Sequence, residues 1–298
     1  MRVVLFASGG DIPLCALQAL RQVSDVVAVV RPGTEPGALP ALRRVARRLV
    51  RGAPPPDPLS ALTQQRGIPE RRIRGAADPS LAPWLRTLGT ELVCVATFPW
   101  RVRDDVLAVP PFGAMNVHPS RLPRHRGPNP WFWTYHADDR EAGVTVHVCA
   151  PSIDAGAVLA QRSWPLPRGY PVASLHREVA ERGAALLAET VEAAGRNAQQ
   201  PVPQDETRAT RAPRVPPGTA MVDYTWPVER VWHLLAGTAG QFREPLRSSG
   251  APAVYDRVPR FEPCAPRVAA GTVEVVRPDA VWRLWCRDGF VQLEGGAG

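Results

Sequence analysis

Residues 113–130 read Gly113-Ala-Met-Asn-Val-His-Pro-Ser-Arg-Leu-Pro-Arg-His-Arg-Gly-Pro-Asn-Pro130, an apolar strand followed by a loop rich in proline and arginine. Asn116 and His118 are two positions apart in the expected strand, so their side chains leave the same face. Both lie at its carboxyl end, where the sheet of an α/β protein opens the crevice that holds ligands. The pair can present an amide donor and a titratable base to one atom, which predicts a catalytic site.

A second polar stretch, Ser152-Ile-Asp-Ala-Gly156, follows the strand expected over residues 143–150. If the two strands are parallel neighbours, Asp154 emerges at the same edge of the sheet as His118 and becomes its partner. Taken singly, a histidine near a strand end and an Asp-Ala-Gly turn are commonplace. The polar residues together, with the proline-rich loop between them, indicate one catalytic set of Asn116, His118 and Asp154.

Short apolar runs alternate with helical patterns on both sides of these stretches. Strands are expected over residues 2–7, 25–30, 91–97, 113–118 and 143–150. Helices are expected over residues 13–22, with Asp11 as the capping residue, and over 81–88, 130–136 and 172–194. This alternation predicts an α/β catalytic domain over residues 1–195, with a doubly wound, mostly parallel, Rossmann-like sheet.

The texture of the sequence changes after residue 195. Residues 196–220 are rich in Gln, Pro, Thr and Arg without a period, which predicts a linker. A helical stripe begins near residue 228, and strands are expected over 272–276, 281–286 and 290–294, with turns at 278–279 and 288–289. Residues 221–298 are therefore expected to form a small β-rich, barrel-like second domain.

The composition excludes several classes of enzyme. The 36 residues counted as Lys+Arg are all arginine, so a Schiff-base lysine, a P-loop lysine and a kinase lysine are absent. The five cysteines form no CxxC pair, which favours a reduced compartment and no metal site. No apolar run reaches membrane length, and the apolar run over residues 2–7 is too short for the core of a signal peptide. A cytoplasmic protein with no membrane contact is therefore expected.

The basic excess is concentrated in one expected helix. The formal net charge of +8 favours a polyanionic partner, although an arginine-rich solvated surface would give the same value. Over residues 42–51 one helical face is apolar, and the other carries only arginines: Arg43, Arg44, Arg47, Arg48 and Arg51. This face could hold phosphates, or it could be the solvated back of a packed helix.

The spacing Asn116-x-His118-x-Ser120-x-Leu122-Pro123-x-x-x-Gly127-x-x-Pro130, with Gly143-Val-Thr145 and Asp154-x-Gly156 after it, resembles the signature of formyltransferases that use 10-formyltetrahydrofolate. Residues 209–213, 222–227 and 270–273 also resemble later parts of that family, so the resemblance covers most of the chain. It implies a transferase of one-carbon metabolism that moves a formyl group from 10-formyltetrahydrofolate to an amine without a metal.

The resemblance also implies a role for each residue of the set. His118 would take the proton of the acceptor amine, Asn116 would donate to the developing oxyanion, and Asp154 would pair with His118. The folate would lie between the loop Phe98-Pro-Trp100 and the loop over residues 150–154. The expected folate contacts are Phe98, Trp100, Ser152 and Ile153.

Two departures from the family pattern concern the acceptor. Arg126-Gly-Pro-Asn-Pro-Trp-Phe-Trp133 replaces the Arg-Gly-Ala-Ala-Pro that is typical of methionyl-tRNA formyltransferases, and His147 stands where relatives that formylate small amines commonly have a histidine. A small-molecule amine, such as an amino sugar nucleotide or a biosynthetic intermediate, is therefore the expected acceptor. The alternatives are initiator Met-tRNA as the acceptor and an inactive folate- or RNA-binding relative; the oligomeric state is not indicated.

Overall fold

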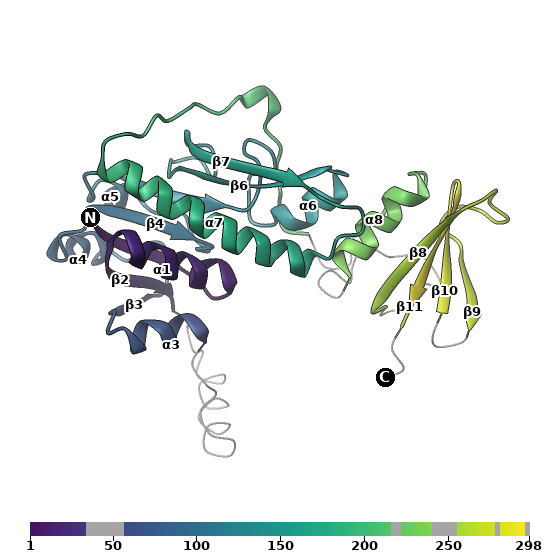
Figure 1. Cartoon of the computed structure of the whole chain (residues 1–298), viewed down its shortest axis with the longest axis horizontal. Helices are drawn as coiled ribbons and strands as arrows, with labels where there is room; N and C mark the ends of the chain where they lie inside the picture. The colour runs from purple at the N-terminus through teal and green to yellow at the C-terminus, as the bar shows by residue number, and fades with distance from the viewer. Residues whose placement is uncertain (34–56, 216–221, 240–254, 278–280, 296–298) are drawn as a thin grey trace, which may run out of the picture. The chain divides into compact units, whose positions relative to one another are not determined.

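The computed structural model describes residues 1–33, 57–215, 222–239, 255–277 and 281–295, which Figure 1 draws in colour. The basic helix expected over residues 42–51 and the turn expected at 278–279 lie outside these residues, as does part of the predicted linker. The chain forms two compact units, and the domain division predicted at residues 196–220 stays a prediction. The first unit contains Met1–Pro123, Val144–Arg162 and Arg177–Ala209, and the second contains Arg124–Gly143, Ser163–His176 and Thr210–Gly298.

A seven-stranded sheet of order β3-β2-β1-β4-β5-β6-β7 forms the larger part of the fold. The neighbouring strands from β3 to β5 are parallel, whereas β6 is antiparallel to β5. The predicted doubly wound, mostly parallel sheet is confirmed, as is each strand predicted within it. The bounds are β1 Arg2–Ala7, β2 Asp25–Pro32, β3 Glu70–Ile73, β4 Leu92–Ala96, β5 Ala114–His118, β6 Glu141–Val148 and β7 Val158–Pro165.

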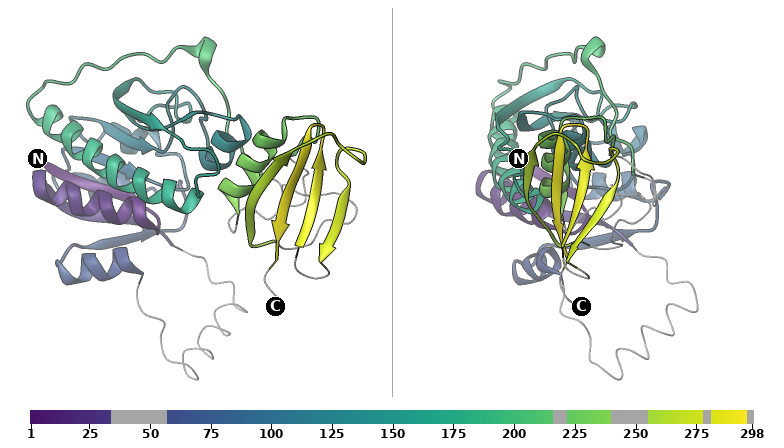
Figure 2. Two further views of the ribbon diagram at one scale, coloured as in Figure 1. Left: turned by 45° about the vertical axis from the view of Figure 1, so that its right-hand side comes forward. Right: turned by 90° about the vertical axis from the view of Figure 1, so that its right-hand side faces the viewer.

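Helices cover both faces of this sheet. α1 (Asp11–Val23) and α7 (Val172–Gly195) lie side by side along one face in all views (Figures 1 and 2). α4 (Leu81–Thr87) and α5 (Asp104–Leu107) cover the other face, where they enclose one apolar core with alternate residues of β1, β2 and β4. Burying each large apolar side chain of that core contributes about 1.5–3 kcal/mol to folding.

The start of α1 differs from the prediction that Asp11 caps it. Gly10, which adopts a positive φ of 107°, occupies the cap position, and Asp11 is the first helical residue. A glycine takes this conformation without steric cost. The carboxylate of Asp11 instead lies in the first turn, where negative charge interacts favourably with the helix dipole.

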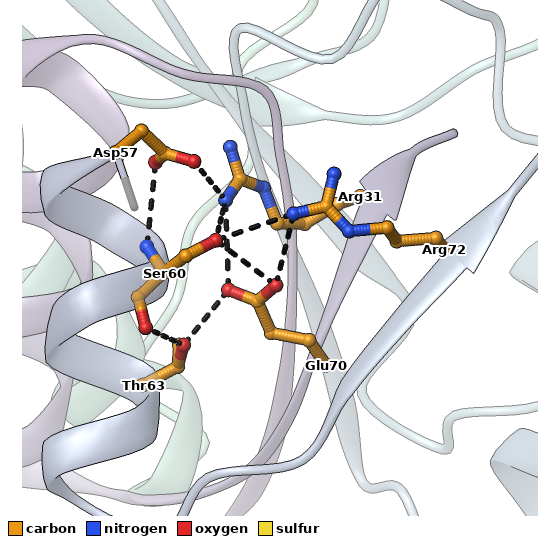
Figure 3. Close-up of polar contacts among 6 residues, drawn as sticks. All are labelled: Arg31, Asp57, Ser60, Thr63, Glu70 and Arg72. Atoms are coloured by element: carbon orange, nitrogen blue, oxygen red, sulfur yellow. Dashed lines mark hydrogen bonds and ion pairs between the residues drawn. The ribbon is translucent and has the colours of Figure 1, made fainter. Parts of the chain in front are cut away.

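A buried arginine connects the outer strands β2 and β3 of the sheet to the helix that precedes β3 in the sequence. Arg31 of β2 is 5% exposed, and its Nη1 lies 2.8 Å from Asp57 and 3.5 Å from Glu70 of β3. Nη1 also donates to Ser60 of α3 (Pro58–Gln65), as Figure 3 shows. Partial burial raises the pKa of Asp57, but hydrogen bonds from Arg31 and Ser60 outweigh it and hold that pKa below its ordinary value. The cluster therefore ties β2, β3 and α3 together.

The second unit contains α6 (Pro130–His136), which the sequence predicts correctly, and a four-stranded antiparallel sheet of order β8-β11-β10-β9. α8 (Val228–Thr238) packs on this sheet, where the Trp232 ring lies 5.1 Å from that of Phe261. The strands are β8 Arg257–Pro263, β9 Val273–Arg277, β10 Val281–Cys286 and β11 Gly289–Glu294. The expected β-rich second domain is confirmed, although its described strands form an open sheet rather than a barrel. None of the helices within the described ranges combines the length and the hydrophobicity of a membrane-spanning segment.

Part of the predicted linker pairs with the loop that follows β5. The backbone of Arg126 donates to the Thr210 carbonyl at 2.9 Å and accepts from the Ala212 N–H at 2.7 Å. Gly127 faces the same segment at a φ of 125°, and a Cβ there would lie 2.8 Å from the Ala212 carbonyl oxygen. Only glycine allows this approach, which explains the glycine in the sequence pattern.

His233 is a buried histidine whose side chain contacts other residues of the second unit. It is 0% exposed, its Nδ1 accepts the N–H of Gly169 at 2.9 Å, and its ring lies 5.1 Å from that of Tyr135. Burial, reinforced by the positive charge of Arg168, lowers the pKa of His233 from 6.5 to about 4. The folded protein therefore holds this side chain neutral.

We expect Arg31→Met to lower the free energy of unfolding by about 3 kcal/mol, because it leaves two carboxylates facing each other at the sheet edge. Arg72→Met is the matched control, since Arg72 pairs with Glu70 in the same cluster but its side chain is 53% exposed. That control should lose less than about 1 kcal/mol. Urea denaturation measures both, and equal losses would contradict the role given to Arg31.

We expect the stability of the protein to fall as the pH drops from 6.5 to about 4, because in this window the unfolded His233 binds a proton that the folded one does not. The contribution is fully present above pH 6.5, and about 3 kcal/mol is lost by pH 4. His233→Asn keeps an acceptor for the Gly169 N–H and should flatten this dependence. The check is thermal unfolding against pH; an equally steep fall in the variant would refute the assignment.

Candidate active site

The antiparallel pairing of β5 and β6 brings a histidine to Asn116. Asn116 lies directly opposite His147, and His118 lies opposite Thr145. Residues opposite each other in a sheet project from the same face, and the Asn116 amide nitrogen Nδ2 lies 3.1 Å from His147 Nε2. His118 and His147 are both buried, with ring centroids 6.3 Å apart.

Asp154 reaches the same place through a turn between β6 and β7. Its Oδ2 lies 3.5 Å from Nδ1 of His118, and its Oδ1 lies 3.6 Å from Nε2 of His147. The predicted partnership of Asp154 with His118 is seen, but the condition attached to it, that the two strands are parallel, is wrong. β6 runs away from the carboxyl end of β5, and the chain has to turn back before Asp154 meets His118.

The turn over residues 150–157 is tightly built. Asp154 adopts a positive φ of 54°, and the N–H of Ala155 donates to the Ser152 carbonyl at 3.3 Å. At Gly156, a Cβ would lie 1.9 Å from the Val148 carbonyl oxygen, so no side chain fits there. The glycine in the Asp-x-Gly pattern therefore allows the turn to close against β6.

His147 belongs to the site, although the sequence marks it only as a departure concerning the acceptor. Its Nδ1 lies 2.9 Å from the Val148 carbonyl oxygen, and a carbonyl can only accept. In the neutral ring the proton is therefore assigned to Nδ1, which leaves Nε2 to accept from the Asn116 amide. This bond fixes which end of the amide is nitrogen. If the antiparallel direction of β6 were known, the sequence would show that a polar residue, His147, lies opposite Asn116, and this would have placed His147 in the site.

The arrangement can support proton transfer next to an oxyanion. One N–H of Asn116 is used by His147, and the second has no partner among the described residues. His118 faces Asp154 with Nδ1, and its imidazole is the titratable group of the site that can act as a base. A carboxylate beside an imidazole stabilises the protonated ring that such a base becomes. Amide donor, base and supporting carboxylate therefore meet at the end of β5.

Cysteine and metal chemistry are not indicated in this part of the fold. Cys149 lies just before the turn, and burial, with a smaller effect of Asp154, raises the pKa of its thiol to about 12. The thiolate, which is the nucleophilic form, is therefore disfavoured. Among the described residues, no group of three or more His, Cys, Asp or Glu side chains could hold a metal ion.

The residues expected to contact a folate lie in two loops. Phe98 and Trp100 follow β4, and Phe98 packs edge to face between Phe6 and Trp100, with ring centroids 5.3 and 5.5 Å away. Ser152 and Ile153 lie in the turn before Asp154, and Ile153 is 56% exposed. These loops offer apolar surface, and the assignment of folate contacts stays a prediction.

The two tryptophans of α6 pack within their own unit. The ring of Trp131 lies 4.0 Å from that of His176, and Nε1 of Trp133 donates to the Pro213 carbonyl at 2.8 Å. Both side chains are half-buried. The aromatic run thus has a structural task, which is to attach α6 to neighbouring segments of the second unit.

Comparison with known proteins identifies relatives for most of the chain. The family described as formyl transferase matches residues 1–191. A methionyl-tRNA formyltransferase of Roseiflexus sp. (strain RS-1) is 36% identical over 58% of this chain and 54% of its own length, so the chain spans about half of that relative. Another, from Moorella thermoacetica, is 31% identical over 80% of this chain and 73% of its own length.

A solved structure has a similar fold at lower identity. An N-formyltransferase from Helicobacter canadensis, in complex with folinic acid and dTDP-3-aminofucose, aligns with a TM-score of 0.70 and 14% identity over 99% of both chains. At this identity the likeness concerns the fold alone. Because the alignment covers nearly all of both chains, that protein shares both the α/β unit and the second, mainly antiparallel unit.

We expect His147→Leu to release the Asn116 side-chain amide, because the substitution removes the acceptor at 3.1 Å. In NMR spectra of a ¹⁵N-labelled protein, the Asn116 side-chain proton that is donated to His147 should then exchange with water faster, by roughly tenfold for the loss of one hydrogen bond. His147→Gln is the matched control, since a glutamine oxygen can accept the same bond. Unchanged exchange in the leucine variant would show that His147 does not hold Asn116.

Proposed function

The chain belongs to the formyl transferase family, and we propose that it transfers a formyl group from 10-formyltetrahydrofolate to an amine. The observation that carries this proposal is the meeting of Asn116, His118 and Asp154 at the end of β5. It supplies a base for an amine, a donor for an oxyanion and a carboxylate that supports the base. These are the groups that acyl transfer to nitrogen requires.

In the first step, the neutral amine nitrogen attacks the formyl carbon. His118 accepts the proton that the nitrogen loses, and Asp154 stabilises the resulting imidazolium. Negative charge develops at the same time on the formyl oxygen, where the second N–H of Asn116 donates. Because His147 fixes the orientation of that amide, the donor points to the oxyanion before the reaction begins.

In the second step, the bond between the formyl carbon and the folate nitrogen breaks. The nitrogen takes up a proton, tetrahydrofolate leaves, and the acceptor carries the formyl group as a formamide. Asp154 is 12% exposed as a side chain, so water can reach its carboxylate and relay the proton from His118. No metal takes part in either step.

The folate is assigned to the surface offered by the two loops beside the site. Phe98 and Trp100 supply aromatic rings, and Ile153 supplies an exposed apolar side chain. The pteridine ring is flat and largely apolar on its faces, so covering these side chains would favour binding by the hydrophobic effect. Ser152 adds a hydroxyl next to Ile153.

The acceptor we propose is a small-molecule amine, such as an amino sugar nucleotide or a biosynthetic intermediate. This proposal is supported by His147, because relatives that formylate small amines commonly have a histidine at this position. His147 contacts Asn116 of the site. Initiator Met-tRNA is the second candidate, supported by the relatives named methionyl-tRNA formyltransferase and by the arginines over residues 42–51. An inactive folate- or RNA-binding relative is the third, and the complete set at the end of β5 opposes it.

Incubation with 10-formyltetrahydrofolate and separate pools of amino sugar nucleotides and charged initiator tRNA tests the proposal. We expect a formylated sugar nucleotide, identified by mass. Formylation of Met-tRNA alone would overturn the small-amine acceptor and keep formyl transfer. If the protein binds 10-formyltetrahydrofolate but formylates no amine, formyl transfer is excluded and the protein is an inactive folate-binding relative.

The variants His118→Ala and Asp154→Asn test the roles of these two residues in the same assay. Each should lower turnover by about 10²–10⁴-fold, the usual contribution of a general base, while thermal unfolding shows that the fold is kept. Turnover within a few-fold of the parent protein in His118→Ala would exclude His118 as the base.

A further inference from the structure

A glutamine from the predicted linker contacts the turn that carries Asp154. Nε2 of Gln204 lies 2.9 Å from the Asp154 carbonyl oxygen and 2.7 Å from the Gly156 carbonyl oxygen. A side-chain amide has two N–H groups, so one nitrogen can donate to both carbonyls. Gln204 lies beyond α7 in the sequence, about 50 residues from Asp154, so this contact is not a local feature of the turn.

The turn needs such a donor because of its backbone conformation. A left-handed conformation at a residue other than glycine costs of order 1–3 kcal/mol and persists only when its surroundings hold it. Asp154 has this conformation, with a φ of 54°. Within the turn, the Ala155 N–H reaches the Ser152 carbonyl at 3.3 Å, which is a long hydrogen bond. The two bonds from Gln204 are shorter, and they hold the backbone on either side of Ala155.

The position of the turn decides the geometry of the site. The Asp154 carboxylate lies 3.5 Å from His118 and 3.6 Å from His147, and these separations depend on the backbone that carries it. An ion pair near a partly exposed site weakens as the charges move apart. A relaxed turn would therefore leave His118 without the carboxylate that supports its protonated form.

We propose that Gln204 is a positioning residue, which acts on the reaction through Asp154 by holding the turn over residues 150–157. The inference rests on the proposed function for its kinetic consequence, but the holding of the turn is a property of the fold alone. The segment after α7 is then part of the active site rather than a connection only, and its length is constrained by the need to bring Gln204 to this turn.

The first test measures the turn itself and needs no activity. Gln204→Leu keeps the size of the side chain and removes both donors. Amide hydrogen exchange at Ala155 should become roughly tenfold faster, as expected for the loss of about one to two hydrogen bonds. Gln199→Leu is the matched control, since Gln199 is also half-buried in this segment and donates to the Thr190 carbonyl of α7 at 3.1 Å.

The second test uses a double-mutant cycle in the formyl-transfer assay. Gln204→Leu should lower kcat by roughly tenfold, because two hydrogen bonds that hold the turn are lost. The KM for the amine should change little, whereas the KM for 10-formyltetrahydrofolate should rise, because the same turn carries Ser152 and Ile153 of the proposed folate surface. In an Asp154→Asn background the same change should cost almost nothing, since Gln204 acts through the Asp154 carboxylate. Gln199→Leu should leave kcat unchanged.

The outcomes separate this inference from the proposed function. If the parent protein transfers no formyl group but exchange at Ala155 still accelerates in Gln204→Leu alone, the proposed function fails and the holding of the turn stands. Unchanged exchange in Gln204→Leu overturns the inference whatever the activity. A kcat loss that is equally large with and without the Asp154 carboxylate also overturns it, because Gln204 would then act by another route.

Discussion

The antiparallel pairing of β6 with β5 is the constraint on which the site depends. It places His147 opposite Asn116 and Thr145 opposite His118, so two residues of β6 face two residues of β5 on one face of the sheet. In a parallel pair the chain would leave β6 at the same edge as His118. Here it leaves at the other end of β5, and the turn carrying Asp154 has to fold back. The glycine at 156 and the donors of Gln204 are consequences of that return.

One hydroxyl extends the same pairing into the loop after His118. The Thr145 Oγ1 donates to the Ser120 carbonyl at 2.7 Å and accepts from the Leu122 N–H at 3.2 Å. The side-chain amide of Gln161 in β7 donates to Thr145 Oγ1 at 2.8 Å and to the Leu122 carbonyl oxygen at 2.9 Å. Buried polar groups of this kind are costly unless all are bonded, so the network specifies one conformation of the loop. The His118 loop and the Asp154 turn are thus each held by a glutamine amide.

Among the described strands, the sequence predicts the buried ones and the edge strand β9, but it misses the edge strands β3, β7 and β8, for a physical reason. β1 and β4 are buried along almost their whole length, so they read as apolar runs. β5 is apolar except at Asn116 and His118 of the candidate site. β3 reads Glu-Arg-Arg-Ile at the sheet edge. Glu70 is satisfied by Arg31 and α3, and Arg71 pairs with Asp78, which no local pattern shows. β7 and β8 alternate weakly and contain polar residues or proline. The contact of Asp154 with His118 was predicted, but the direction of β6 depends on tertiary packing and was not.

The departures that concern the acceptor are not equally informative once the structure is known. The aromatic run of α6 is used within the second unit, because Trp131 packs on His176 and Trp133 bonds to the Pro213 carbonyl. Packing therefore accounts for Trp131 and Trp133 without any contact to an acceptor. His147 differs in kind, since its ring contacts both Asn116 and Asp154. In the proposed reaction these are the groups that would face the formyl oxygen and support the base, so the argument for a small amine now depends on His147 and no longer on the tryptophans.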